Sequence, residues 1–234
     1  MSSYSREALK KVSTATLTTV LFKRGLRNVF IQGVFLLTAN RNVRMVGEAY
    51  TLRYIPARED IDQLGAFEGR GHPQREAIEA CPPGHVLVMD ARRDASAATG
   101  GDILMTRLMV RGAAGIVTDG GLRDSTTIEK LDFPVYCGAR SAPLNLVRHH
   151  AVDSQVPIGC GGVPVYPGDV VVGDAEGVVV IPAKLADEVA AEAAKQTEFE
   201  DWVEARVKEG RSIFGLYPPD EKTRAEFEAW KNKR

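Results

Sequence analysis

The sequence has few cysteines and few of the short motifs that announce a reaction. Three cysteines, Cys81, Cys137 and Cys160, are widely separated and odd in number. This pattern argues against a disulfide framework or a zinc site and predicts reduced thiols in the core or in loops. The glycine cluster around Cys160 matches neither nucleotide-binding fingerprint and is better interpreted as a turn. No Gly-x-Ser-x-Gly motif is present, so nothing indicates a serine triad.

An excess of charge of one sign is also missing. The chain has 30 Lys and Arg against 31 Asp and Glu, for a formal net charge of −1. Without a basic run before the last few residues, the charge pattern of a protein that binds nucleic acid or an anionic membrane is absent, which favours a small-molecule partner. No apolar stretch is long enough to span a bilayer, and the N-terminus lacks an apolar leader segment. We therefore expect a cytoplasmic protein with no membrane partner.

What the sequence does contain is enough apolar material for a full core, with 44% hydrophobic residues in a chain of 234. That length fits one domain with extensions. We expect a single domain over residues 1–234, with its core at about 40–182 and a C-terminal helical extension over 183–234. Short helices interspersed with strands and glycine-rich turns indicate an α/β fold with a mixed sheet.

Apolar spacing predicts the individual elements. The expected helices are 5–24 (one helix or two short ones), 72–81, 102–111, 125–130 and 182–209, followed by a charged helix that ends at Trp230. The expected strands are 44–55, 85–91, 115–118, 133–137, 152–158, 170–174 and 177–182. The long helix needs a partner surface, in its own domain or in a neighbouring subunit. Adjacent residues on a regular element point apart, so we expect His149 and His150 to be surface residues and not a metal pair.

The most informative stretch is residues 100–124. A double glycine precedes Asp102 and a helix, whose N-terminus offers unpaired N–H groups and a partial positive charge to a carboxylate or phosphate. The following strand then delivers Arg123 and Asp124 into a loop at the same end. Arginine can grip a carboxylate at two points, and the two acids offer hard oxygen ligands for Mg²⁺ or Mn²⁺. An ordinary helix N-cap and a surface ion pair would look the same, and spacing alone does not decide.

Within the helix of this stretch, the apolar residues are spaced as one face. Ile103, Leu104, Leu108 and Met109 recur at helical intervals, which predicts one apolar helical face.

Asp102, twenty intervening residues and Arg123-Asp124, preceded by Gly-Gly, resemble the Asp-x20-Arg-Asp signature of the RraA-like family. The similarity continues at 47–51, 84–90, 167–169 and 173–182, so that it covers roughly residues 40–215. That family includes metal-dependent 4-hydroxy-4-methyl-2-oxoglutarate / 4-carboxy-4-hydroxy-2-oxoadipate aldolases and regulators of ribonuclease activity. The resemblance implies a compact mixed-sheet β/β/α core of the swivelling phosphohistidine-domain type, with N- and C-terminal helical extensions, assembled into homotrimers or homohexamers.

The resemblance also implies an activity. The chain would be a divalent-metal-dependent lyase, a class II pyruvate aldolase that cleaves a 4-hydroxy-2-oxo acid to pyruvate and a second carbonyl compound and also decarboxylates oxaloacetate. Mg²⁺ or Mn²⁺ would be bound directly by Asp124 and through water by Asp102. The expected catalytic residues are Arg123 and Asp102, and the expected substrate-binding residues are Gly101, Asp102, Ile103, Leu104 and Arg123.

Two alternatives stay open at this point. One is a non-catalytic regulator that binds and inhibits an RNA-processing endonuclease, which some members of the family are. The other is a related lyase or hydratase that acts on a 2-oxo acid derived from a sugar acid. In the aldolases an acid from the adjacent subunit also reaches the metal's water shell, and Glu198 and Glu200 are the candidates here.

Overall fold

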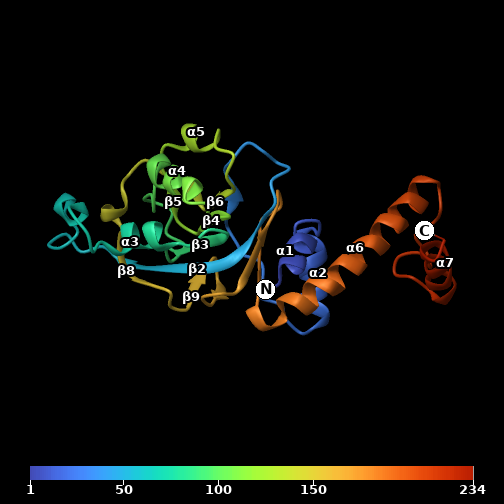
Figure 1. Cartoon of the computed structure of the whole chain (residues 1–234). Coiled ribbons are helices and arrows are strands. Elements are labelled where there is room, and N and C mark those ends of the chain that lie inside the picture. The colour runs from blue at the N-terminus through green and yellow to red at the C-terminus, as the bar shows by residue number, and fades with distance from the viewer. Residues whose placement is uncertain (234) are drawn as a thin grey trace.

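The computed structural model describes residues 1–233, which form an α/β fold around one large mixed sheet (Figure 1). The sheet has eight strands in the order β1-β6-β4-β3-β2-β11-β12, and β8 also pairs with β2. The strands are β1 (Phe35–Leu36), β2 (Met45–Pro56), β3 (His85–Asp90), β4 (Gly115–Thr118), β6 (Val135–Cys137), β8 (His149–Ser154), β11 (Val170–Gly173) and β12 (Val178–Ile181). The predicted class, a mixed-sheet α/β fold, is confirmed.

The centre of the sheet is parallel and its margins are antiparallel. Strands β2, β3, β4 and β6 run in the same direction, whereas β1, β8, β11 and β12 pair antiparallel to their neighbours. Every residue of β4 is buried, as expected for a parallel strand that is covered on both faces. The carboxyl ends of β3 and β4 meet at one edge of the sheet, so the loops that follow them start side by side.

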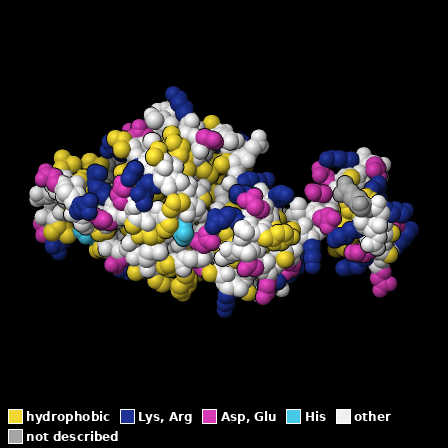
Figure 2. Space-filling model, in the orientation of Figure 1, with side chains coloured by type: hydrophobic (Ala, Val, Ile, Leu, Met, Phe, Trp, Pro, Cys, Tyr) yellow, Lys and Arg dark blue, Asp and Glu magenta, His cyan; other side chains and the backbone are white. Residues whose placement is uncertain are grey.

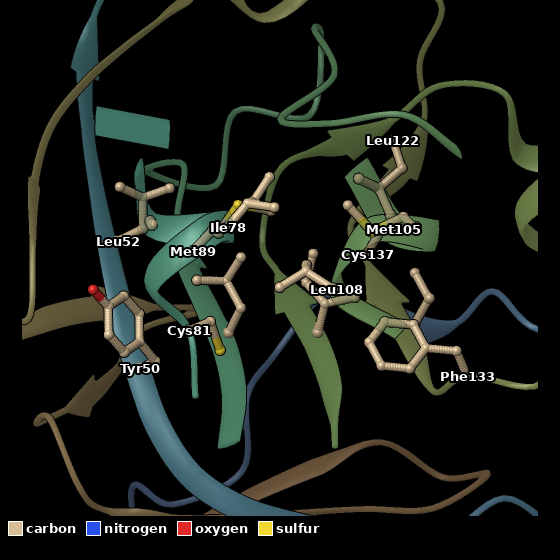
Figure 3. Close-up of a cluster of buried hydrophobic side chains, with 14 of the residues drawn as sticks. Tyr50, Leu52, Ile78, Cys81, Met89, Met105, Leu108, Leu122, Phe133 and Cys137 are labelled. Atoms are coloured by element: carbon tan, nitrogen blue, oxygen red, sulfur yellow. The ribbon is translucent and has the colours of Figure 1, made fainter. Parts of the chain in front are cut away.

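One face of the sheet is covered by α3 (Pro73–Ala80), α4 (Asp102–Val110) and α5 (Ser125–Ile128). Figure 3 shows Ile78 of α3, Cys81 directly after α3, and Met105 and Leu108 of α4 packed among strand residues such as Met89. The predicted apolar face of α4 is partly wrong. Ile103 is 78% exposed, and Met105 takes its place in the core.

A separate two-stranded sheet contributes to the apolar cluster on the opposite face. It consists of β9 (Ile158–Cys160) and β10 (Val163–Val165), which join Val86, Val88 and Val117 in one cluster. Side chains alternate along a strand, so β3 places Leu87 and Met89 in one cluster and Val86 and Val88 in the other.

The N-terminal helices α1 (Ser3–Leu9) and α2 (Thr14–Lys23) pack against the first part of the long helix α6 (Ala186–Lys208). Helix α6 then extends away from the sheet and leads to α7 (Glu221–Lys231) at the far end of the molecule (Figure 1). The remaining short elements are β5 (Gly121–Leu122), β7 (Ala139–Arg140) and the 3₁₀ helices η1 (Leu64–Phe67), η2 (Asn145–Val147) and η3 (Ala183–Leu185).

Most predicted elements are confirmed to within a few residues, including two short helices within 5–24 and the hairpin of β11 and β12. The three cysteines are free and buried, as predicted. The strand predicted at 152–158 is wrong in its bounds. Strand β8 ends at Ser154, and Gln155 has a positive φ of 57°, which turns the chain before β9. The phosphohistidine-domain type and the division into one domain stay predictions.

The surface position predicted for His149 is wrong. Its side chain is fully buried, and its ring centroid lies 5.7 Å from that of Tyr54 on the neighbouring strand β2. Alternation along β8 sends one of two adjacent side chains inward, and His150 is the one that stays partly exposed. Among residues 1–233, no helix is long and apolar enough to cross a membrane.

Candidate functional site

A pocket of about 220 Å³ opens where the loops after β3 and β4 meet the N-terminus of α4. All six residues predicted for the site line it: Gly101, Asp102, Ile103, Leu104, Arg123 and Asp124. The sequence did not indicate six further residues of the lining: Phe67, Gln74, Arg75, Ala98, Leu144 and Asn145. The volume is below the roughly 300–1,000 Å³ typical of sites for drug-sized ligands and suits a small metabolite.

The start of α4 is held by its own residues. The carbonyl oxygen of Gly101 accepts hydrogen bonds from the amides of Leu104 and Met105, both at 3.1 Å. The Asp102 carboxylate accepts a 2.7 Å hydrogen bond from the amide of Ile103. The amides of Ile103 and Leu104, which were expected to take a substrate carboxylate, therefore have partners within the chain in this state. A ligand that uses the Ile103 amide has to displace Asp102 from it.

Asp124 adopts a backbone conformation that is rare for a residue with a side chain. Its φ of 56° and ψ of 33° are left-handed, and such residues persist where the surrounding structure holds them, often at functional sites. The amide of Arg123 donates to the carbonyl of Gly100 at 3.1 Å, which ties the loop to the start of α4. Arg123 Nε lies 3.2 Å from Asp124 Oδ2, so the two side chains form an ion pair at the pocket wall.

The Asp124 carboxylate lies against the backbone of Gly101, where a side chain would meet it. A Cβ atom at position 101 would be 2.5 Å from Asp124 Oδ2 and 3.1 Å from Arg123 Cγ. An added side chain would therefore have to displace the Asp124 carboxylate from its present position. The segment of Gly101 and Asp102 that opens α4 and the loop that carries Arg123 and Asp124 are twenty residues apart in sequence, and they meet here as predicted.

Behind the pocket, a buried hydrogen-bond network supports the double glycine. Gln74 Nε2 of α3 donates to the carbonyl of Thr99 at 2.5 Å, and Thr99 Oγ1 donates to Thr118 Oγ1 at 3.0 Å. This network connects α3, the loop that follows β3 and the end of β4. Sequence analysis missed Gln74, which is 3% exposed; the available signal was a polar residue at a position that faces the core of an amphipathic helix.

The carboxylates in the pocket suit a hard divalent cation that keeps much of its water. Asp102 and Asp124 both line the pocket, and both are accessible to solvent. Within residues 1–233 there is no group of three or more His, Cys, Asp or Glu side chains arranged to hold a metal ion. Two carboxylates are a common protein contribution to Mg²⁺, whereas a structural zinc ion needs four ligands. The residues present therefore fit Mg²⁺ or Mn²⁺ better than zinc.

Glu198 and Glu200 do not line the pocket of their own chain. Both lie on α6, and both have intramolecular partners. Lys231 Nζ lies 3.0 Å from Glu198 Oε2, and Thr16 Oγ1 donates to Glu200 at 2.8 Å. A contribution from either acid would have to come from a neighbouring subunit, and it stays a prediction.

Charges of both signs are interspersed on the face drawn in Figure 2, where Lys and Arg side chains stand beside Asp and Glu over both the sheet region and the far end of α6. No continuous basic area is visible on that face. The expectation that nucleic acid is not a partner stays a prediction.

The fold and the pocket define a class of α/β proteins with a mixed sheet and an acid–arginine–acid set at the N-terminus of one helix. A family model for RraA-like proteins, described as Aldolase/RraA, matches residues 14–180. The chain therefore belongs to the RraA-like family, which confirms the resemblance found in the sequence.

Individual relatives differ in what their names say. A protein of Halalkalibacterium halodurans, provisionally named a 4-hydroxy-4-methyl-2-oxoglutarate aldolase, is 36% identical over 158 residues, which make up 67% of this chain and 69% of the relative. The solved structure of Streptomyces coelicolor RraAS2, described as an unusual member of the RNase ES inhibitor RraA protein family, is 30% identical, with a TM-score of 0.76 over 86% of this chain and 96% of that one. An uncharacterized protein from Pseudomonas syringae pv. tomato matches in fold, with a TM-score of 0.81 at 24% identity over 93% of this chain and 94% of that one.

Proposed function

We propose that this protein is a divalent-metal-dependent lyase that cleaves a 4-hydroxy-2-oxo acid to pyruvate and a second carbonyl compound. The observation that carries the proposal is the convergence of Asp102, Arg123 and Asp124 on one small pocket at a helix N-terminus. A protein that only binds another protein has no physical need for this set. The aldolase name of the Halalkalibacterium halodurans relative supports the same reaction class.

The residues of the pocket suit the charge that this reaction develops. Cleavage of the C3–C4 bond leaves its electron pair on the pyruvate fragment, and the keto oxygen gains negative charge. Arg123 would donate hydrogen bonds to that oxygen as the charge grows. The substrate carboxylate would lie at the N-terminus of α4, where the helix dipole favours an anion. Asp124 would bind Mg²⁺ or Mn²⁺ directly and Asp102 would do so through water; the bound cation would supply Lewis acidity toward the keto acid.

A proton also has to move. The 4-hydroxyl group loses its proton as the C3–C4 bond breaks, and C3 of the pyruvate fragment later gains one. A water molecule held by Asp102 would accept the first proton and return it to C3. The same arrangement would decarboxylate oxaloacetate, since loss of CO₂ places the same charge on the same fragment.

The second candidate function is a non-catalytic regulator that inhibits an RNA-processing endonuclease. It is favoured by the Streptomyces coelicolor structure, which is described as a member of the RNase ES inhibitor RraA protein family. Pyruvate release from oxaloacetate and from 4-hydroxy-2-oxo acids, measured with and without Mg²⁺, separates the two functions. The lyase requires turnover that depends on the metal. Absence of turnover at every metal concentration, together with tight binding to an RNA-processing endonuclease, would establish the regulator instead.

We also propose that the working form is a homotrimer or homohexamer.

Two variants test the assigned roles. We expect Arg123→Ala to lower kcat/KM by roughly 10²–10³-fold, the range for loss of one donor to a developing oxyanion. We expect Asp124→Ala to abolish Mn²⁺ binding in a calorimetric titration. Arg70, which is exposed and lies outside the pocket, supplies the control variant Arg70→Ala. Full activity of Arg123→Ala, or full metal binding by Asp124→Ala, would contradict the assignment.

A further inference from the structure

Asn145 is a buried polar residue of the pocket wall with an unused hydrogen-bond donor. Its side chain is 5% exposed, and Nδ2 has no hydrogen-bond partner among residues 1–233. The residue nevertheless lines the pocket of about 220 Å³ that also contains Asp102, Arg123 and Asp124. A buried amide without a partner is unfavourable, so such a group in a pocket wall indicates a contact that a bound ligand completes.

Backbone hydrogen bonds fix Asn145 relative to the two segments that carry the charged residues of the pocket. Strand β7 pairs with β5, and the amide of Ser141 donates to the carbonyl of Leu122 at 2.9 Å, directly before the loop of the arginine and the acid. The amide of Ala98 donates to the carbonyl of Pro143 at 2.8 Å, in the loop that leads to α4. The same backbone contacts that place the charged residues therefore place the amide of Asn145.

The C4 end of the proposed substrate has to contact the part of the lining that the 2-oxo acid end leaves free. Besides the N-terminus of α4 and the charged residues, the lining includes Phe67, Gln74, Arg75, Leu144 and Asn145. Two of these side chains are apolar, and Gln74 Nε2 already donates to a backbone carbonyl. The guanidinium carbon of Arg75 lies 4.7 Å from the centroid of the Phe67 ring, in a cation–π contact. Asn145 is the member of this group with a neutral N–H donor that has no partner in the described chain.

We propose that Asn145 donates a hydrogen bond to the C4 oxygen of the 4-hydroxy-2-oxo acid and is a catalytic residue of its cleavage. The C4 oxygen gains negative charge as its proton passes to the water held by Asp102. The electron pair of the O–H bond then forms the C4=O bond, while the pair of the C3–C4 bond passes to the pyruvate fragment. A fixed donor at this oxygen stabilises the charge and leaves the O–H hydrogen to the water molecule. This inference rests on the proposed lyase function.

The kinetic test compares two reactions of the same pocket, one with a C4 oxygen and one without. The first is cleavage of 4-hydroxy-2-oxoglutarate. The second is exchange of the methyl protons of pyruvate with deuterated water, which forms the same enolate without any C4 atom. Asn145→Leu keeps the approximate size of the side chain and removes its N–H group. With Mg²⁺ present, it should lower kcat/KM for cleavage by roughly 10- to 100-fold, the range for a hydrogen bond to a charged group, and leave the exchange rate close to that of the wild type.

Two further variants serve as controls. Asn145→Ser keeps a shorter donor and should retain part of the cleavage activity. Asn42→Leu makes the same substitution at an exposed residue outside the pocket and should leave both reactions unchanged. A purely structural role of Asn145 would lower cleavage and exchange together. A parallel fall of both reactions in Asn145→Leu, or undiminished cleavage, therefore overturns the catalytic role of Asn145 and leaves the lyase standing.

A binding measurement decides the case in which the wild type cleaves no 4-hydroxy-2-oxo acid, a result that refutes the lyase. Calorimetric titration in the presence of Mn²⁺ then compares 4-hydroxy-2-oxoglutarate with 2-oxoglutarate, which lacks only the hydroxyl group. Tighter binding of the hydroxy acid by the wild type, lost in Asn145→Leu, supports the contact with the C4 oxygen. Equal binding of the two acids, binding of neither, or a preference that Asn145→Leu retains refutes the contact as well.

Discussion

The sheet region joins segments that are far apart in sequence, whereas the C-terminal arm, residues 198–231, joins near neighbours. Strand β2 pairs with β3, with β8 and with β11, which begins more than a hundred residues later. The arm instead closes one small cluster around Trp202, Leu216 and Phe227. The pocket resembles the sheet region in this respect, since its wall is assembled from five separate segments of the chain.

This difference has consequences for stability and for the site. A cluster built from neighbouring residues can open locally, whereas a strand pair between distant residues opens only with the rest of the sheet. Damage to the arm should therefore stay in the arm, and damage to the sheet region should reach the pocket. The predictions below test this contrast, from the largest expected effect to the smallest.

The largest effect is expected from core truncations in the two regions. Leu108→Ala removes a fully buried side chain between α4 and the sheet and should lower the free energy of global unfolding by roughly 2–5 kcal/mol. Phe227→Ala empties the arm cluster, where the ring lies 5.2 Å from Phe199 and 5.6 Å from Trp202 between centroids. Amide hydrogen exchange should then show lost protection throughout the sheet for the first variant and only within 198–231 for the second. If Leu108→Ala and Phe227→Ala cause equal loss of protection in β3 and β4, the two regions do not differ in this way.

A smaller effect, confined to the pocket, is expected from Gly101→Ala. The new Cβ would push the Asp124 carboxylate from its position 2.5 Å away, while the extended backbone of residue 101 tolerates alanine. Because misplacement of a catalytic group by about 1 Å can cost roughly 10²-fold, we expect kcat/KM to fall by roughly 10- to 100-fold with the melting temperature nearly unchanged. Gly159→Ala is the matched control, since its Cβ would have no heavy atom within 4 Å. Equal activity of the two variants would argue against a tight contact at position 101.

The smallest effect concerns pH. Burial lowers the pKa of His149 below the ordinary histidine value of about 6.5, so the folded protein favours the neutral ring. In the unfolded chain the ring binds a proton as the pH falls through about 6.5, so stability should be full above that pH and decline toward the lower pKa of the folded state. Urea unfolding at pH 8 and pH 5.5 measures the decline, and His149→Gln should make it smaller. If His149→Gln leaves the difference in unfolding free energy between pH 8 and pH 5.5 unchanged, His149 is not the source of that difference.

The stretch 100–124 shows how far local sequence goes in predicting a site. Glycines before Asp102 and the strand that ends before Arg123 and Asp124 are local signals, and the parallel neighbours β3 and β4 bring their loops to one edge. Gln74, Arg75 and Asn145 carry no such signal. They reach the pocket because α3 and η2 pack beside it, and these contacts depend on chain segments many residues away.

The errors have the same origin. His149 is buried because β8 pairs with β2 along the register Pro56 with His149, and no local pattern announces that pairing. Ile103 departs from the apolar face predicted for α4 because the start of the helix lines the pocket, where this side chain is 78% exposed.

The sequence by itself determined the main helices and strands in their order, the membership in the RraA-like family and the three charged residues of the candidate site, but not the two-stranded sheet of β9 and β10. Those features follow from apolar periodicity, glycine placement and a short motif, all of which act over neighbouring residues. Only the tertiary structure decided which other side chains share the pocket, that the Asp124 carboxylate lies against the backbone of Gly101, and that Glu198 and Glu200 lie away from the pocket of their own chain. The reason is that each depends on contacts between distant segments, which the packing of the sheet and its helices sets as a whole.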